Sequence, residues 1–275
     1  MSGIEVKLIK HSASADTGKP IATFQLKYHR YILSEVNTHR MLSRNSSSSR
    51  AIPIAKTIDQ VRNSPAMPIH WGKNIPGMQA TEQLEGSELE DAKRIWLEAA
   101  NKVADLAEEL DRLGIHKQVG NRIMEPFTYI STIVTSTEWD NFFELRAHPD
   151  AQPEFHELAV KMRDAMENST PTILNVGDWH LPYISDEEAT TLDTELLIKM
   201  SAARCARVSY LTHDGKKPNI DNDLKLYDRL VGSVPLHASP IEHQATPLID
   251  EYEPSRNFRG WSQYREMVEE DFLSW

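Results

Sequence analysis

The sequence predicts an α+β fold, with an antiparallel sheet and flanking helices, in one compact domain over residues 1–275. The first observation is that residues 4–9 and 21–28 alternate between apolar and polar side chains, which is typical of strands. A Gly18-Lys19-Pro20 turn separates them and favours antiparallel pairing. The second observation is that apolar residues recur at helical spacing through most of the remaining chain. Helices therefore outnumber strands.

The other elements follow in order. A β-branched and aromatic run predicts a buried strand at 127–136. Gly114 and Pro126 are expected to end helices, and Thr137 to cap one. A segment rich in Pro, Gly, Asn and Met at 57–87 predicts an irregular insertion, either a wall of a site or plain surface. The expected helices cover residues 30–44, 88–113, 115–125, 138–146, 152–168, 193–210 and 221–231, with loops at 175–183 and 236–246 and a tail that ends in a helix and an exposed aromatic terminus.

Composition excludes several classes of protein. The net charge is −11 and the pI about 5.5, which argues against general nucleic-acid binding. Cys205 is the single cysteine, so an intrachain disulfide framework and a thiolate metal cluster are excluded. The first residues lack the apolar core of a signal peptide, and no apolar run is long enough to span a membrane. We therefore expect a soluble, cytoplasmic protein with no membrane or nucleic-acid partner.

The stretch 38–53 contrasts with this acidic background. No Asp or Glu occurs between Val36 and Ile58, although the chain has 41 acidic residues. Arginine and lysine side chains supply permanent charge there, and serines supply neutral donors, a combination that suits phosphate. A flexible Ser-rich loop explains the same composition equally well. The basic residues are Arg40, Arg44, Arg50 and Lys56.

Common catalytic motifs are absent, including the dinucleotide-binding, Walker, zinc-protease and nucleophile-elbow patterns. His237 and His243 lie near each other but are expected to form hydrogen bonds, so we predict no metal site. Cys205 is expected to pack in a helix. Arg122 and Arg146 each lie beside apolar helical residues, so each either pairs with an acid or faces a ligand.

Taken together, these segments resemble the flavin-dependent thymidylate synthases. The signature of that family is Arg-His-Arg, seven residues, Ser, and an Arg two positions later; here Thr38-His39-Arg40 is followed by seven residues, Ser48 and Arg50. Residues 114–126 resemble a second family segment. Residues 141–146 and 151–154 resemble a third, the N-F-x-x-L-R…A-Q-x-E block.

A fourth resemblance is out of order. Residues 202–209 (AARCARVS) and 237–243 (HASPIEH) resemble segments that normally precede the strand similar to 21–28. Here they follow it. The chain therefore looks circularly permuted over about 195–250, which a fold tolerates when its termini lie close together at the surface.

The resemblance implies roles for particular residues. Arg146 would lie against the pyrimidine edge and act as the catalytic residue. The positions implied for FAD are Thr38, His39, Arg40, Asn141, Ser209, His237 and Ser239. Those implied for dUMP are Glu35, Ser46, Ser47, Ser48, Ser49, Arg50, Arg122 and Arg146.

The resemblance also implies transfer of a one-carbon unit to C5 of dUMP, giving dTMP, with FAD as cofactor and NADPH and 5,10-methylenetetrahydrofolate as co-substrates. It implies a homotetramer with sites between subunits. Thr38 replaces the first Arg of the signature, and Ser46 stands where Glu is common. These departures leave open a sister reaction that forms a 5-hydroxymethyl nucleotide from dUMP or dCMP. A non-catalytic nucleotide- or RNA-binding protein is the second alternative.

Overall fold

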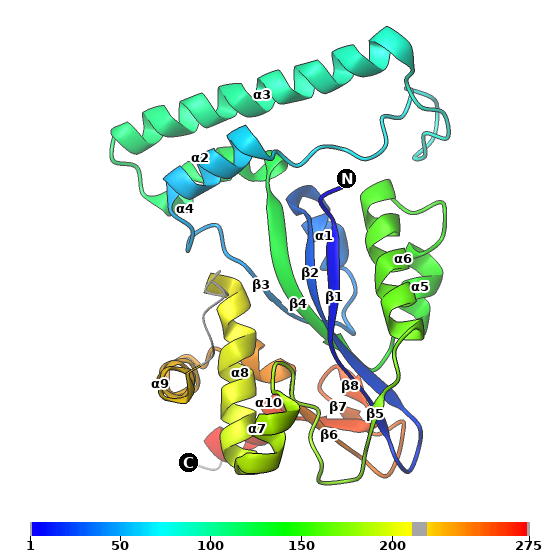
Figure 1. Ribbon diagram of the computed structural model, residues 1–275, viewed down its shortest axis with the longest axis vertical. Coiled ribbons are helices and arrows are strands. Elements are labelled where there is room, and N and C mark those ends of the chain that lie inside the picture. Colours follow the sequence, from blue (N-terminus) through cyan, green and yellow to red (C-terminus); the bar gives the residue numbers. More distant parts are fainter. Residues whose placement is uncertain (1, 211–218, 274–275) are drawn as a thin grey trace.

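The computed structural model describes residues 2–210 and 219–273 of the protein (Figure 1). The strands are β1 (Glu5–Ser14), β2 (Pro20–His29), β3 (Ser43–Ser46), β4 (Tyr129–Ser136), β5 (Thr172–Leu174), β6 (Ala245–Pro247), β7 (Pro254–Ser255), β8 (Phe258–Arg259) and β9 (Trp261–Gln263). The α-helices are α1 (Leu33–Val36), α2 (Ile54–Asn63), α3 (Gly86–Arg112), α4 (Lys117–Gly120), α5 (Asp140–Arg146), α6 (Pro153–Glu167), α7 (Asp186–Thr191), α8 (Thr194–Tyr210), α9 (Ile220–Val231) and α10 (Tyr264–Leu273). Three 3-10 helices are η1 (Arg30–Ile32), η2 (Arg122–Phe127) and η3 (Ser239–Glu242).

A five-stranded sheet in the order β3-β4-β2-β1-β5 organises the molecule. The β1–β2, β2–β4 and β3–β4 pairs are antiparallel, and only the short β5 runs parallel to its neighbour β1. Gly18, with φ of +73°, makes the turn between β1 and β2. The predicted α+β class and the predicted antiparallel hairpin are therefore confirmed.

Helices cover both faces of this sheet. Phe24 of β2 and Val134 of β4 point to the face that packs on α5 and α6, in one buried cluster with Phe142 and Phe155. Ile133 points to the opposite face and packs against Cys205 and Val208 of α8. Figure 1 shows α5 and α6 on one side of the strands and α8 on the other.

A second layer lies across one end of the sheet. The long helix α3 runs over α2 and η2 (Figure 1), and its Ala100, Ala104 and Ala107 are fully buried against Ile58 and Met124. The predicted helix 88–113 is confirmed. Gly114 follows it with φ of +78°, as its role as a helix stop requires.

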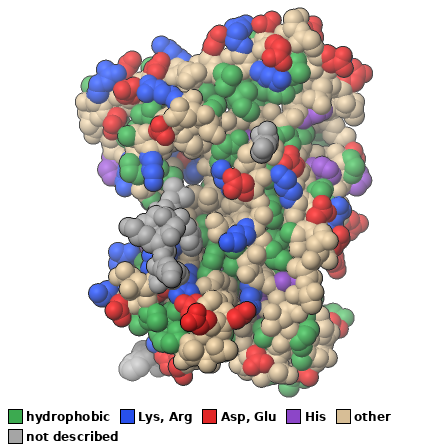
Figure 2. All heavy atoms as spheres, in the orientation of Figure 1, with side chains coloured by type: hydrophobic (Ala, Val, Ile, Leu, Met, Phe, Trp, Pro, Cys, Tyr) green, Lys and Arg blue, Asp and Glu red, His purple; other side chains and the backbone are tan. Residues whose placement is uncertain are grey.

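The outer surface of α3 is solvated and mixed in charge. Arg94 pairs with Asp91 at 3.0 Å and with Glu98 at 2.8 Å. Figure 2 shows acidic and basic side chains interspersed on the viewed face around this helix. This face offers no basic surface of the kind that nucleic acid requires.

Several predicted boundaries are wrong. The helix expected at 30–44 ends at Val36, because the chain turns and then pairs as β3 with β4. The insertion expected at 57–87 contains part of α2, whose buried Ile54, Ile58 and Val61 have helical spacing. The helix expected at 115–125 divides into α4 and η2.

Thr137 does not cap α5; its hydroxyl instead accepts a hydrogen bond of 3.0 Å from the backbone N–H of Arg259. Helices α6, α8, α9 and α10 confirm the predictions for the second half of the chain. The aromatic terminus at 274–275 lies outside the described residues. Within the described chain, no helix is both long and apolar enough to cross a membrane.

Candidate functional site

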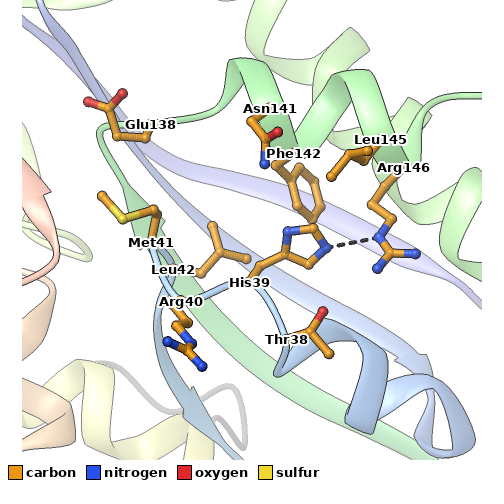
Figure 3. Close-up of a pocket in the computed structure, with 10 residues that line it drawn as sticks. All are labelled: Thr38, His39, Arg40, Met41, Leu42, Glu138, Asn141, Phe142, Leu145 and Arg146. Carbon is orange, nitrogen blue, oxygen red and sulfur yellow. Dashed lines mark hydrogen bonds between the residues drawn. The ribbon is translucent and has the colours of Figure 1, made fainter.

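A cavity of about 370 Å³ lies where the turn after α1 meets α5. The turn contributes Thr38, His39 and Arg40, and α5 contributes Asn141 and Arg146 (Figure 3). We call this the His39 cavity. Its remaining lining residues are Met41, Leu42, Glu138, Phe142 and Leu145. Two segments about a hundred positions apart in sequence therefore meet at one site.

His39 and Arg146 form the polar centre of this cavity. Nε of Arg146 donates a hydrogen bond of 2.9 Å to Nε2 of His39 (Figure 3). The imidazole is therefore neutral, with its proton on Nδ1. Burial, together with the charges of Arg146 and Arg44, lowers the pKa of His39 to about 4. The ring accordingly stays neutral at physiological pH.

Packing fixes the orientation of both side chains. The guanidinium of Arg146 lies 4.6 Å from the ring centroid of the fully buried Phe155. Such cation–π contacts favour one orientation of the charged group. The ring of His39 meets that of Phe142 edge-on at 5.0 Å. From the side of β3, Arg44 donates a 2.7 Å hydrogen bond to the carbonyl of His39. The side chain of Arg146 is therefore held in one orientation by Phe155 and His39.

The serine run does not form one loop. Ser46 ends β3, and its hydroxyl lies 2.9 Å from that of Thr132. Ser47 is buried and receives a 3.2 Å hydrogen bond from the backbone N–H of Ser131. Ser48 accepts a 3.3 Å hydrogen bond from the N–H of Arg50 in a tight turn. The run is therefore built into the sheet edge, which argues against the flexible-loop alternative.

Asn121 holds this turn in place. Its side chain is 1% exposed, and its amide donates to the carbonyls of Ser49 at 2.7 Å and Ile52 at 2.8 Å. A buried carbonyl without a donor is costly, so one side chain stabilises two backbone positions. Asn121 is a residue that sequence reasoning missed. Its position in the 114–126 segment was the available signal.

Ser47 and Ser49 line a second cavity, of about 410 Å³. We call it the Lys56 cavity. It also collects Lys27, Arg30 and Lys56. Sequence reasoning missed Lys27 and Arg30. They lie in the β2 and η1 segments, for which the sequence predicts secondary structure but no binding role. The residues predicted to bind dUMP therefore do not share one cavity. Arg146 lines the His39 cavity, whereas Ser47 and Ser49 line the Lys56 cavity.

Five of the predicted dUMP residues line neither cavity: Glu35, Ser46, Ser48, Arg50 and Arg122. Arg122 is exposed and forms an ion pair with Glu125 at 2.9 Å. Of the two predicted roles, pairing with an acid or facing a ligand, this chain shows the first. Glu35 lies on α1, and its carbonyl accepts a 2.7 Å hydrogen bond from the Thr38 hydroxyl. The departure at Thr38 therefore leaves a short, neutral side chain in the His39 cavity.

The segment that looks permuted packs against the sheet near the signature. The Ser239 hydroxyl donates to Oδ1 of Asn45 at 3.3 Å, and Nδ1 of the buried His243 lies 2.9 Å from the Thr135 hydroxyl. Ala245 shares a buried cluster with Ile21, close to the start of β2. His237 is exposed, and neither it nor Ser239 lines the His39 cavity. The backbone of Ser209 lies in the last turn of α8, and its side chain is not among those that the structure describes.

Two further features are structural. Cys205 is fully buried, and burial raises the pKa of its thiol, so it is a core residue and not a nucleophile. Arg204, 3% exposed, pairs with Asp223 at 2.9 Å and with Glu188, which ties α8 to α9 and α7. Within residues 2–210 and 219–273, no three His, Cys, Asp or Glu side chains are placed to hold a metal ion.

The comparison that decides the family is a family model. Residues 6–172 match the model described as "Thymidylate synthase complementing protein". The chain belongs to this family. These are the flavin-dependent thymidylate synthases that the signature, the 114–126 segment and the 141–154 block resemble, so that resemblance is confirmed.

Solved structures and curated proteins give weaker relations. Two crystal structures of the UMP/dUMP methylase PolB from Streptomyces cacaoi, bound with 5-Br UMP and 5-Br dUMP, are 17% and 16% identical to this chain. Both cover 60% of this chain, and 89% and 90% of their own chains, with a TM-score of 0.48. No curated protein matches the sequence significantly.

Proposed function

We propose that this member of the thymidylate synthase complementing family transfers a one-carbon unit to C5 of dUMP, giving dTMP. The observation that carries the proposal is the His39 cavity, where the signature turn and Arg146 are joined by a hydrogen bond. These residues come from two separate family segments. Their convergence on one cavity supports a shared role in chemistry over independent structural roles.

The cavity residues fit a flavin ring. Its walls combine apolar side chains with hydrogen-bonding groups on Thr38, His39 and Asn141, which is the mixture that a planar heteroaromatic ring requires. No other described residue forms a hydrogen bond with Nδ1 of His39, so this donor is available to a ligand. Bound FAD would supply the hydride chemistry, with NADPH as reductant and methylenetetrahydrofolate as one-carbon donor.

Arg146 would stabilise the negative charge that develops on the N3/O4 edge of the pyrimidine and so make C5 nucleophilic. Because His39 is neutral and accepts from Arg146, it orients the guanidinium without cancelling its charge. Phe155 limits the freedom of the same group. A protein nucleophile is not part of this scheme, in agreement with the buried thiol of Cys205.

Ser48, Arg50 and Arg122 are the proposed phosphate ligands. The side chains of Arg50 and Arg122 are exposed, and neither residue lines the His39 cavity. Arg122 reaching a site in a neighbouring copy would reconcile these facts, so we propose a homotetramer with sites between subunits. Size-exclusion chromatography with light scattering tests this assembly, and a monomer with full activity contradicts it.

We further propose one domain over residues 1–275 that is circularly permuted at about 195–250. The buried cluster that Ala245 shares with Ile21 supports this arrangement, since the unpermuted order would join the HASPIEH turn to the start of β2. The Ser239–Asn45 and His243–Thr135 hydrogen bonds support it as well.

The sister reaction, with a hydroxymethyl product or with dCMP as substrate, is the second candidate. It is favoured by Thr38, a neutral side chain in the His39 cavity at the position where the family signature has a cation. The loss of one charge there would alter how the transferred carbon or the pyrimidine edge is stabilised.

Two measurements test the proposal. Purified protein should show flavin absorbance, or bind added FAD, and mass spectrometry should find dTMP after incubation with dUMP, NADPH and methylenetetrahydrofolate. A product heavier than dTMP by one oxygen, or turnover of dCMP alone, would select the sister reaction. A protein that neither binds flavin nor changes either nucleotide would instead favour the binding-protein alternative.

A further inference from the structure

The segment formed by β7, β8 and β9 packs against the central sheet. Strands β7 and β8 pair antiparallel and β9 follows directly, and we call residues 254–263 the β7–β9 segment. Its Phe258 and Trp261 are fully buried in one cluster with Ile21 of β2. The segment lies outside the family match at residues 6–172, so that match assigns it no role.

Asn257 connects the β7–β9 segment to the turn that carries His39. Its side-chain amide donates a 3.3 Å hydrogen bond to the carbonyl of Met41, a residue that lines the His39 cavity. Its Oδ1 accepts a 3.1 Å hydrogen bond from the hydroxyl of Ser43, the first residue of β3. The Met41 carbonyl also accepts a 2.9 Å hydrogen bond from the Ser136 hydroxyl on β4. The turn is therefore held both from the sheet and from the β7–β9 segment.

Gln263 fixes the orientation of the Asn257 amide. Its side chain is 1% exposed, and its Nε2 donates to Oδ1 of Asn257 and to the hydroxyl of Ser43, each at 3.0 Å. Since Gln263 and Ser43 both donate to the same atom of Asn257, that atom is the oxygen, and the nitrogen must face Met41. Buried polar networks in which each group is paired admit few other arrangements.

The β7–β9 segment also supports a second residue of the same wall. The indole N–H of Trp261 donates a 3.2 Å hydrogen bond to the carbonyl of Lys19. The ammonium group of Lys19 pairs with the carboxylate of Glu138 at 2.6 Å. Figure 3 shows Glu138 and Met41 together on the side of the cavity away from Arg146. This wall therefore depends on contacts from the β7–β9 segment.

Two carbonyls of the His39 turn are bonded from outside it. Arg44 donates to the carbonyl of His39 at 2.7 Å, and Asn257 donates to that of Met41, two residues later. Groups at a binding site keep a defined geometry when such supporting hydrogen bonds lock them. The two bonds together therefore limit the directions in which the His39 ring can project.

We propose that the β7–β9 segment holds one wall of the His39 cavity and that Asn257 is its positioning residue, acting through the carbonyl of Met41. Loss of the Asn257 amide leaves this carbonyl with Ser136 alone and loosens the turn. The consequence for FAD rests on the proposed function, whereas the consequence for the geometry of the turn does not.

The first experiment needs no ligand. Titration of the histidine rings by NMR compares wild type, Asn257→Ala and Asn101→Ala, which loses one hydrogen bond on exposed α3. A loosened turn admits water, so the pKa of His39 should rise from about 4 toward 6.5 in Asn257→Ala only. Lower stability alone would leave the pKa in the folded protein where it was. An unchanged pKa of His39 in Asn257→Ala overturns the proposal.

The second experiment measures FAD binding by calorimetry. Asn257→Ala should bind FAD about tenfold more weakly than wild type, the effect of losing one hydrogen bond that orders the site. Asn101→Ala should bind like wild type. Equal affinity in all three proteins overturns the role of Asn257. A wild-type protein that does not bind FAD contradicts the proposed function instead, and the titration of His39 then decides the role of Asn257 by itself.

The third experiment uses the wild-type protein, so it does not depend on the folding of a variant. If the segment orders the FAD site, bound FAD must in turn stabilise the segment, because coupling is reciprocal. The backbone N–H of Arg259, bonded to the Thr137 hydroxyl, should exchange with deuterium at least about fivefold more slowly in saturating FAD. The N–H of Glu188, bonded to the Ser185 hydroxyl on exposed α7, is the matched control and should not change. Equal exchange of Arg259 with and without bound FAD overturns the proposal.

Discussion

The two cavities differ in how their polar groups are balanced. In the His39 cavity, Arg146 is held by a neutral imidazole and by the ring of Phe155, so its charge is oriented but kept. In the Lys56 cavity, Arg30 shares one carboxylate oxygen of Glu125 with Arg122, which lies outside the cavity, and three buried polar atoms of the lining have no partner. The polar groups of the first site thus have partners that fix their orientation, whereas several polar groups of the second do not.

This difference shows how one sheet supports two kinds of recognition. Alternation along β2 and β4 sends Phe24 and Val134 to one face and Lys27 and Ser131 to the other. The apolar face packs the helices that fix Arg146. The polar end of the other face lines the Lys56 cavity.

Removing the guanidinium of the His39 cavity should have the largest effect. Arg146→Ala should lower turnover by about a hundredfold or more, the cost of one preorganised charge at a transition state. Flavin absorbance should be retained. Arg163→Ala, on the exposed side of α6, is the matched control. Near-normal turnover in Arg146→Ala would remove Arg146 from the chemistry.

The second-largest effect is expected from removing the Asn121 side chain, which holds the turn at Ser49 and Ile52. Asn121→Ala leaves the carbonyls of Ser49 and Ile52 without donors and should lower the free energy of unfolding by about 2 kcal/mol. Asn101→Ala, on exposed α3, should change it by less than about 0.5 kcal/mol. Urea denaturation measures both. Equal stability of the two variants would mean that Asn121 does not hold the turn.

The neutral imidazole of His39 sets the pH dependence expected of the His39 cavity. The folded-state pKa of His39 is lowered from 6.5 to about 4, so its stabilising contribution is complete above pH 6.5 and is lost as pH falls toward 4. Flavin affinity should therefore change little between pH 8 and pH 6.5. Calorimetry with FAD at several pH values measures this; a steep change in affinity between pH 8 and pH 6.5 would contradict a neutral imidazole in that range.

The smallest expected effect is on the imidazole itself. Arg146→Ala removes a positive charge that disfavours protonation and should raise the pKa of His39. Arg163→Ala should leave it unchanged. Titration of the histidine ring by NMR measures the shift. An unchanged pKa in Arg146→Ala would show that burial alone keeps the ring neutral.

Sequence patterns predict the elements that depend mainly on their own residues. The alternation in 21–28 and the apolar stripe ending at Gly114 each correspond to an observed element, β2 and α3. The sequence Ser43–Ser46 has no strand signal, because it becomes a strand only by pairing with β4, some ninety residues later. The helix predicted at 30–44 is therefore longer than the observed one, which ends at Val36.

The same reason applies to the sites. The signature spacing identified the His39 cavity, since its residues occur in recognisable blocks. The Lys56 cavity draws on β2, η1, α2, η2 and β4, and its lining residues are individually ordinary. Only the arrangement of these elements in space brings Lys27, Arg30 and Lys56 together.

The late position of α8 affects how the protein is made. One face of the sheet is covered by α8 and the turn at His243, which come from the last third of the chain. During synthesis, β1, β2, β3 and β4 all leave the ribosome before their cover exists. Thr23 and Thr135, buried and bonded to each other at 2.7 Å, remain solvated until then. This face must therefore stay soluble for more than a hundred residues of translation, and its row of hydroxyl groups suits that requirement.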